Sequence, residues 1–278
     1  MKSIAALLTV HNRKEQTLAC LKALFLCDLP EDYRLDVFLV DDGCTDGTPE
    51  AVKEQFSQVK IIQGDGSLFW NRGMHLAWTT AADHNDYDFF LWLNDDTILF
   101  PEAIRELLVC SESESHQSII CGSTCAVNDE SEITYGGRIF KDTLVIPGDK
   151  KQHCDYFHGN IVLVPRGIFS KLGTNDPFFR HALGDFDYGL RAGKRGISSI
   201  VAPHILGTCD EHETFAAWCD PKTPVLKRFK LLYTPLGNHP FEFFKYERRH
   251  QGLGMACFHF LTNHLRALMP VLWKDRNK

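Results

Sequence analysis

Short apolar segments alternate with segments of helical apolar spacing along residues 1–117, and this alternation constrains the fold more than any other feature. Short apolar runs bounded by turn residues suit strands that are buried on both faces of a sheet. Strands that alternate with helices pair in parallel through right-handed crossovers. The sequence therefore predicts an α/β fold with a mostly parallel, Rossmann-like central sheet flanked by helices. The strands are expected at residues 3–10, 35–40, 59–62 and 88–93, and the helices at 13–27, 48–56, 71–82 and 101–110.

The pattern changes after about residue 118. Residues 118–147 read as strands and turns, with Gly136 and Gly137 at the tip of a hairpin. From residue 222 the composition becomes basic and aromatic. We therefore expect a domain over residues 1–221, with halves at 1–117 and 118–221, followed by a helical extension over 222–278. Within the second half, strands are expected at 158–165 and 197–202, helices at 166–172 and 185–194, and a loop at 174–184.

Composition narrows the class of protein. The chain has 278 residues, of which 44% are hydrophobic, so it can bury a full core. It contains no run of 18 apolar residues, and the sequence therefore predicts no transmembrane helix. The apolar part of residues 1–15 is short and runs into a charged helix, which favours a first strand over a signal peptide. The ten cysteines are irregularly spaced, which favours free thiols in a reducing cytoplasm.

The charge is distributed unevenly along the chain. The whole chain carries −6. Residues 222–278 hold 11 Lys and Arg against 3 acids, a net charge of +8, which leaves −14 for residues 1–221. A basic tail on an acidic body predicts an anionic partner surface.

Two adjacent carboxylates end the most apolar run of the first half. The segment 91–97 reads LWLNDDT, so Asp95 and Asp96 follow a buried strand directly. Open α/β sheets bind their ligands at the carboxyl ends of strands. Adjacent acids repel each other unless a cation lies between them, and oxygen ligands suit Mg²⁺ or Mn²⁺. The sequence therefore predicts a divalent-cation site here.

Polar side chains also follow the other three predicted strands. Backbone amides and polar groups at such turns can contact a nucleotide, and a carboxylate can accept the imino N–H of a pyrimidine ring or a ribose hydroxyl. No G-x-G-x-x-G motif follows the first strand and the chain has no P-loop, which argues against a dinucleotide enzyme and a P-loop ATPase. The candidate binding residues are Thr9, His11, Arg13, Asp41, Asp42, Asp65, Asn71 and Arg72.

Four segments, LLTVHNR, VFLVDDGCTDGT, GDGSLFWNRGM and LWLNDDT, occur in this order. In this set and order, residues 3–210 resemble the inverting family 2 glycosyltransferases of the GT-A fold, of the type that builds bacterial surface polysaccharides. The resemblance implies a UDP- or dTDP-linked sugar donor and a Mn²⁺ or Mg²⁺ cofactor. It further implies that Asp96 binds the metal, that Asp95 binds the ribose or the metal, and that Asp41 or Asp42 binds the nucleobase of the donor. Residues 1–117 would then be the nucleotide-binding half and 118–221 the acceptor-binding half.

The resemblance also places a catalytic base. The segment HALGDFDYGLR matches the family's second acidic motif, and Asp185 falls on the residue that takes the proton of the attacking acceptor hydroxyl. Asp187 is the alternative, although an acid in the first turn of a helix has an ordinary reason to be there. The chain has Gly184 where the family often has Glu.

Many GT-A enzymes add a histidine to the metal ligands, downstream of the base. The resemblance makes His204 the first candidate and His212 the second. A lone histidine is more often a polar filler, so neither role follows from the residues themselves.

The extension from residue 222 contains an amphipathic helix. Two interpretations stay open: the helix lies on an anionic lipid surface, or it packs on the main domain or on a second copy in a homodimer. The apolar face comprises Met255, Phe258, Leu261, Leu265, Leu268 and Leu272.

Together these features predict a metal-dependent inverting glycosyltransferase that acts on a glycan or polyprenyl-linked acceptor, cytoplasmic and peripheral on the inner face of the plasma membrane. A sugar nucleotidylyltransferase is an alternative, but the segment TVHNRKEQ lacks the glycine of its phosphate loop. A non-catalytic glycan-assembly subunit on the same fold is a second alternative. The presence of all the acids named above argues against it. No nucleic-acid partner is expected.

Overall fold

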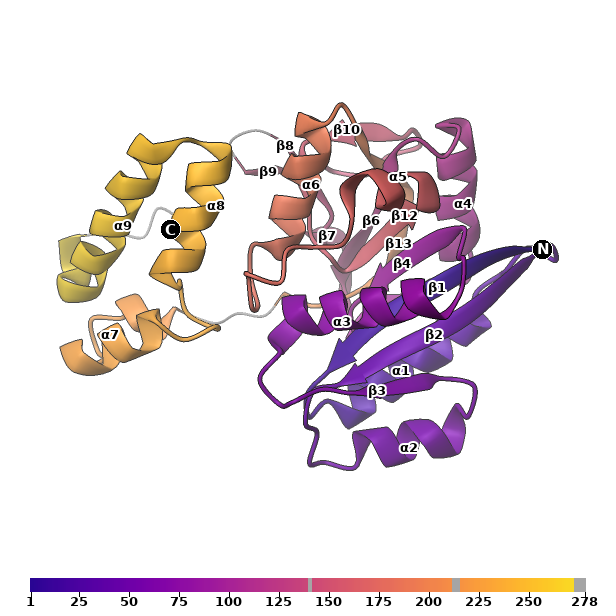
Figure 1. The fold of residues 1–278 in the computed structure, drawn as a ribbon, viewed down its shortest axis with the longest axis horizontal. Helices are drawn as coiled ribbons and strands as arrows, with labels where there is room; N and C mark the ends of the chain where they lie inside the picture. The colour runs from indigo at the N-terminus through magenta and orange to yellow at the C-terminus, as the bar shows by residue number, and fades with distance from the viewer. Residues whose placement is uncertain (140–141, 212–215, 273–278) are drawn as a thin grey trace. The chain divides into compact units, whose positions relative to one another are not determined.

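The computed structural model describes residues 1–139, 142–211 and 216–272 (Figure 1). The chain divides into two compact units. The first, here called the α/β unit, comprises Met1–Pro177 and Gly184–Glu211. The second, here called the helical unit, comprises Phe178–Leu183 and His212–Lys278.

The α/β unit is built on a large mixed sheet. Its main path runs β10-β13-β6-β12-β4-β1-β2-β3, with β5 paired to β13 and β7 paired to β6. The pairs β1–β2, β1–β4, β2–β3 and β6–β13 are parallel, which confirms the predicted mostly parallel sheet. The strands are β1 Lys2–Val10, β2 Tyr33–Asp41, β3 Lys60–Gln63, β4 Phe89–Leu93, β5 Ile98–Leu99, β6 Ile119–Ala126, β7 Asp129–Tyr135, β10 Gln152–Cys154, β12 Ile161–Pro165 and β13 Ser199–Thr208.

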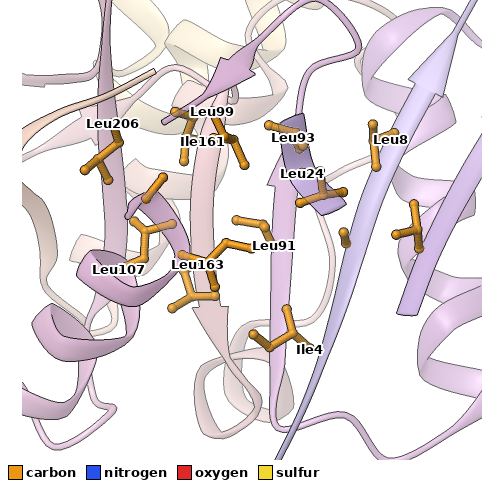
Figure 2. Packing of buried hydrophobic residues seen from close by; sticks show 14 of the residues in the cluster. Ile4, Leu8, Leu24, Leu91, Leu93, Leu99, Leu107, Ile161, Leu163 and Leu206 are labelled. Atoms are coloured by element: carbon orange, nitrogen blue, oxygen red, sulfur yellow. The ribbon is translucent and has the colours of Figure 1, made fainter. Parts of the chain in front are cut away.

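Both faces of this sheet are covered, which explains why β1 is apolar at nearly every position. Ile4, Ala6 and Leu8 pack with α1, α2 and α4 in one core, part of which Figure 2 shows. Ala5 and Leu7 point to the opposite face and pack with α3, α5 and α6 in a second core. The helices are α1 Lys14–Leu26, α2 Thr48–Gln55, α3 Phe69–His84, α4 Ala103–Ser113, α5 Arg166–Leu172 and α6 Gly184–Lys194.

The prediction of a hairpin tip at Gly136 and Gly137 is wrong. Strand β7 ends at Tyr135, and Gly137 begins β8 Gly137–Ile139 in a separate small sheet with β9 Thr143–Leu144 and β11 Tyr156–Phe157. A Cβ atom on Gly137 would lie 2.4 Å from Val201 Cγ2 and 2.7 Å from Cys154 Cβ. Glycine is therefore required here for close packing of the chain rather than for a turn.

Strand β13 is longer than predicted. The predicted strand stopped at residue 202, before Pro203 and His204, yet the strand continues to Thr208. The register between β13 and β6 shifts between Val201 and Ile205, and His204 has a φ of 60°. This irregularity carries the strand past the proline to residues that border the candidate site.

The helical unit has a small core. It contains α7 Val225–Leu232, α8 Pro240–His250 and α9 Leu253–Leu268, with short 3-10 turns at Ala217–Cys219 and Pro270–Leu272. The buried Arg228 guanidinium donates from Nε to the carbonyl of Ala267 (2.6 Å) and from Nη2 to that of Leu268 (3.1 Å). These carbonyls end α9 and lack partners within the helix, so Arg228 closes its C-terminus. Within the described ranges, no helix has the length and hydropathy needed to cross a membrane.

Candidate active site

The sheet register brings the predicted binding segments together. Val10 at the end of β1 pairs with Asp41 at the end of β2, and Asp41 pairs with Gln63 at the end of β3. Strand β4 lies on the other side of β1, with Trp92 opposite Leu7. The turns that follow these four parallel strands therefore meet at one carboxyl edge.

The two acids after β4 surround an arginine from the turn after β1. Arg13 Nη1 lies 2.5 Å from Asp96 Oδ2 and 3.6 Å from Asp95 Oδ1. Asp95 is 7% exposed, and its Oδ2 has no hydrogen-bond partner within the described residues. Burial and the charge of Asp96 raise the pKa of Asp95 to about 7, against the opposing effect of Arg13. Asp95 and Asp96 are therefore two adjacent, largely buried acidic groups, and the Arg13 guanidinium contacts both of them.

This arrangement fits a hard divalent cation. Its donors are carboxylate oxygens, and one of them is buried without a partner. Among the described residues, no cluster of three or more His, Cys, Asp or Glu side chains could hold a metal ion. Asp95 and Asp96 supply two such donors, and Mg²⁺ is commonly held by one or two carboxylates together with substrate phosphates and water.

Of the two histidines predicted as metal ligands, His204 contacts a different segment from the acidic pair. His204 donates its backbone N–H to the carbonyl of Gly148 (3.0 Å), and its Nε2 lies 3.8 Å from Asp149 Oδ1. His212 lies outside the described residues. Cys209, directly after β13, contacts one of the two acids: its Sγ lies 3.6 Å from Asp96 Oδ1.

The two acids after β2 have different surroundings. Both carboxylate oxygens of Asp42 accept backbone N–H groups of the loop after β3, from Gly66 (2.8 Å), Leu68 (3.2 Å) and Phe69 (2.9 Å). Asp41 Oδ1 accepts the N–H of Cys44 (2.8 Å). Asp42 therefore shapes the loop that precedes α3.

His11 adds a second link to this turn, since its Nδ1 donates to the carbonyl of Asp42 (2.7 Å). Asp65, in contrast, is exposed and accepts hydrogen bonds from the N–H and hydroxyl of Ser67, both at 2.8 Å. Asp65 thus makes a local turn that faces solvent.

Three other predicted binding residues make contacts that connect segments of the fold. Thr9 is buried, and its Oγ1 would lie 2.1 Å from a Cβ atom on Gly73 of α3. Asn71 is fully buried and donates from Nδ2 to the carbonyl of Asp176 (2.8 Å), while Arg72 donates from Nε to that of Pro177 (2.8 Å). Asn71 and Arg72 therefore fasten the loop before α6 to the start of α3.

Hydrogen bonds connect the predicted base to the strand end that precedes the acidic pair. Asp185 Oδ2 accepts the N–H of Gly159 (3.0 Å), and the neighbouring Asn160 accepts the N–H of Asn94 at its carbonyl (3.1 Å). Asn94 Oδ1 in turn accepts the indole N–H of Trp70 (2.7 Å). A Cβ atom on Gly159 would lie 2.3 Å from the ring of Trp70. The segment Gly159–Asn160 and the Trp70 ring thus connect Asp185 to the strand end that carries Asp95 and Asp96.

No residue of this bridge was predicted to have a functional role. Trp70 was not among the predicted binding residues, and Gly159 and Asn160 were predicted to belong to a strand that in fact begins at Ile161. The feature of the sequence that could have indicated this bridge is the Gly-Asn pair directly before an apolar run.

The surroundings of Asp185 and Asp187 are unlike. Asp187 is fully buried and its Oδ2 lies 2.8 Å from Arg191 Nε, one turn along α6. Asp185 is half-buried and accepts the N–H of Phe186 (2.9 Å) besides that of Gly159. Burial raises the pKa of Asp185 to about 6, against the opposing backbone hydrogen bonds. Asp185 therefore combines partial exposure with a proton affinity suited to a base near neutral pH, whereas Asp187 serves an internal ion pair.

The unusual glycine before the base has a structural reason. A Cβ atom on Gly184 would lie 1.8 Å from Asn71 Oδ1. Asn71 Oδ1 also accepts the amide N–H of Asn175 (2.6 Å). The space that a side chain at residue 184 would need is therefore taken by the Asn71 amide.

Replacing Gly184 with Ala should lower the free energy of unfolding by about 1–3 kcal/mol, because overpacking displaces the buried Asn71 amide. Urea unfolding measures this change. Gly193→Ala in the same helix is the matched control, since a Cβ atom there would meet nothing within 4 Å, and it should leave stability equal or slightly higher. Equal stability of the two variants would show that Asn71 does not fill this space.

Comparisons with known proteins agree on the class of fold. The model of the family "Glycosyl transferase family 2" matches residues 6–173. No curated protein sequence matches the chain. Among solved structures, S. aureus TarS has a TM-score of 0.56 at 13% identity, over 95% of this chain and 44% of TarS. The chain thus spans less than half the length of TarS.

Two complexes are also similar. TarS 1–349 in complex with UDP-GlcNAc has a TM-score of 0.58 at 14% identity, over 95% of this chain and 73% of that one. The mannosyltransferase PcManGT from Pyrobaculum calidifontis, in complex with GDP-Man and Mn²⁺, has a TM-score of 0.57 at 14% identity, over 98% of this chain and 88% of that one. With the family match, these likenesses confirm the predicted GT-A-like α/β fold.

Proposed function

Because the chain belongs to glycosyl transferase family 2, we propose that it is a metal-dependent inverting glycosyltransferase. It moves a sugar from a nucleotide-diphosphate-sugar donor to a hydroxyl group of an acceptor glycan. One observation carries this proposal: hydrogen bonds through Gly159 and Asn160 link Asp185 to Asn94, which directly precedes the acidic pair Asp95–Asp96. Direct displacement needs a base for the incoming hydroxyl and positive charge near the leaving diphosphate, and these groups can supply both.

Asp96 and Asp95 would hold the cation, Mn²⁺ or Mg²⁺. When bound, such an ion neutralises charge that develops on the departing diphosphate. The unpartnered Oδ2 of Asp95 supports a cation at this position. Arg13, which contacts both carboxylates, is placed to contribute its positive charge to the same diphosphate.

Asp185 acts as the base. Its carboxylate is fixed by the N–H groups of Gly159 and Phe186, so it keeps one orientation while it receives the proton of the acceptor hydroxyl. Asp187 stabilises α6 through Arg191 and takes no part in the proton transfer.

The nucleotide binds across the ends of β1, β2 and β3. Both carboxylate oxygens of Asp42 accept backbone N–H groups of the loop at 66–69. We therefore assign the contact with the nucleobase of the donor to Asp41, whose Oδ1 accepts a single N–H. The donor is a UDP- or dTDP-linked sugar. TarS 1–349 with UDP-GlcNAc and PcManGT with GDP-Man and Mn²⁺ show that related folds bind nucleotide sugars.

The acceptor is a growing bacterial surface polysaccharide, carried on a polyprenyl lipid. Residues 1–117 form the nucleotide-binding half and residues 118–221 the acceptor-binding half. A lipid-linked acceptor brings the enzyme to the cytoplasmic face of the plasma membrane, as a peripheral protein.

The turnover rate should depend on the ionisation of Asp185. Because its pKa is raised to about 6, the carboxylate is lost as pH falls through that value. The rate at saturating donor and acceptor should therefore be level above pH 7 and fall about tenfold per pH unit well below 6. A profile of kcat against pH tests this. A constant rate down to pH 4.5 would exclude Asp185 as the base.

A panel of nucleotide sugars tests the proposed activity. UDP-, dTDP- and GDP-linked hexoses and N-acetylhexoses are added to the protein with Mn²⁺ and with EDTA, and thermal unfolding and donor hydrolysis are measured. At least one donor should raise the melting temperature and be hydrolysed slowly, and only with the metal. No response to any donor would contradict the proposal, and an equal response in EDTA would contradict its metal dependence.

A further inference from the structure

Exposed large apolar side chains are concentrated in the helical unit. Of the 20 found among the described residues, 14 belong to this unit, although it makes up only about a quarter of the chain. Soluble monomers rarely gather so much apolar surface without a partner for it. The 14 residues are Phe178, Val225, Leu226, Tyr233, Leu236, Phe241, Leu253, Met255, Phe258, Leu261, Leu265, Leu268, Met269 and Val271.

Helix α9 carries the most regular part of this surface. Phe258, Leu261, Leu265 and Leu268, here called the apolar stripe, repeat at intervals of three and four residues and are 58%, 63%, 48% and 47% exposed. Met255, also predicted on this face, is 41% exposed. The predicted face extended to Leu272, but α9 ends at Leu268 and the side chain of Leu272 lies outside the described part of the chain.

The opposite side of α9 combines small apolar residues with polar ones, and Ala256 and Ala267 are fully buried on it. His259 pairs there with the buried Glu247 of α8, and His264 Nε2 lies 2.7 Å from the hydroxyl of Tyr233. A helix that packs only on its own unit places apolar residues inward and polar residues outward. In α9 the large side chains of the apolar stripe face outward instead, so this outer face suits contact with an apolar medium or partner.

The charges around this surface have one sign. Over residues 222–271, the two acids are Glu242 and Glu247, which are 6% and 2% exposed and pair with Arg180 and His259. The exposed charged side chains in the same range are Lys222, Lys227, Lys230 and Arg248. The helical unit therefore offers solvent a surface of apolar and cationic groups, without an exposed carboxylate in that part of the chain.

We propose that the helical unit docks on an anionic lipid membrane, with the apolar stripe of α9 buried at the headgroup boundary and the exposed lysines and Arg248 against the headgroups. Apolar burial and attraction of cations to anionic lipids are the two contributions that hold interfacial helices. A second copy of this chain fits less well, because pairing two such surfaces would bring cations together. The docking does not depend on sugar transfer, so it can fail or hold independently of the proposed reaction.

Vesicle co-sedimentation tests the proposal with the full-length protein. Vesicles of phosphatidylcholine alone are compared with vesicles containing phosphatidylglycerol, at low and at high NaCl. Binding should require the anionic lipid and fall as salt rises, because exposed charges are screened. Two variants address the two contributions: Leu261→Ser with Leu265→Ser for the stripe, and Lys227→Glu with Arg248→Glu for the charges. Each should lower the partition coefficient about tenfold or more.

Matched changes in the α/β unit serve as controls. Val109→Ser removes a similarly exposed apolar side chain (57%), and Lys150→Glu reverses an exposed charge. Both should bind vesicles as the native protein does. Equal binding of the stripe variant and Val109→Ser, or no binding to anionic vesicles at low salt, would overturn the proposal. A dimer by light scattering that the stripe variant abolishes, without vesicle binding, would assign the face to a second copy instead.

Discussion

Replacing Asp185 with Asn should lower the rate of sugar transfer by roughly 10²–10⁴-fold and leave donor affinity close to that of the native protein. The amide keeps the size of the carboxylate, and its single oxygen can accept the N–H of Gly159 or that of Phe186, which bond to different oxygens of Asp185. One of these two hydrogen bonds is therefore lost, but the shape of the site should be kept. What it loses is the capacity to take a proton from the acceptor. Single-turnover rates and donor binding by calorimetry separate the two effects.

Asp187→Asn is the matched control for this variant. Asp187 is fully buried against Arg191, so the change leaves a guanidinium without its carboxylate partner and should act mainly on stability. The melting temperature should fall, while the folded fraction keeps its turnover rate within a few-fold. An active Asp185→Asn variant beside a folded but inactive Asp187→Asn variant would transfer the role of base to Asp187.

Asp96→Ala should abolish metal-dependent donor binding and with it transfer. The substitution removes one of the two carboxylates that face Arg13 and would hold the cation. Mn²⁺ binding followed by electron paramagnetic resonance gives a readout that does not depend on turnover. Asp95 alone should retain the ion weakly, so the signal of free Mn²⁺ should rise.

The control for this second prediction is Asp149→Ala, which removes a fully exposed carboxylate that lies beside His204. It should leave Mn²⁺ binding and donor binding unchanged. Native-like Mn²⁺ binding by Asp96→Ala would refute the metal assignment. Loss of Mn²⁺ binding in Asp149→Ala or in His204→Ala would instead restore His204 as a ligand.

The α/β framework was predictable because its signals are local. Strands β1, β2 and β4 are buried on both faces, so each appears in the sequence as an apolar run that ends in polar residues. The crossover rule then places the ends of β1, β2 and β4 at one edge. Asp41 ends β2, and the turns after β1 and β4 carry Arg13 and Asp95. These positions follow from periodicity and chain connectivity alone.

The finer roles of the polar residues depend on contacts between distant segments. Asn71 was predicted to contact the nucleotide, yet its side-chain amide donates to the carbonyl of Asp176, 105 residues away. Asp42 holds three N–H groups of a loop 24 to 27 residues further on. Arg180 pairs with Glu242 across 62 residues, which ties Phe178–Leu183 to the helical unit. No local pattern reports such partners.

Glycines show the same limit. Gly137 was predicted at a hairpin tip and Gly159 within a strand, yet neither has a positive φ. Each instead leaves room for a neighbour from another segment, Val201 beside Gly137 and the Trp70 ring beside Gly159. The bridge between Asp185 and the acidic pair depends on one of these close approaches.

The stereochemistry of the transferred sugar tests the central claim most directly. With a donor found in the nucleotide-sugar panel, slow hydrolysis in D₂O can be followed by proton NMR before the released sugar mutarotates. A single displacement assisted by Asp185 predicts that the first product has the anomeric configuration opposite to that of the donor. A first product with the donor's own configuration would contradict the account, because retention requires a second displacement for which this site is not assigned a nucleophile.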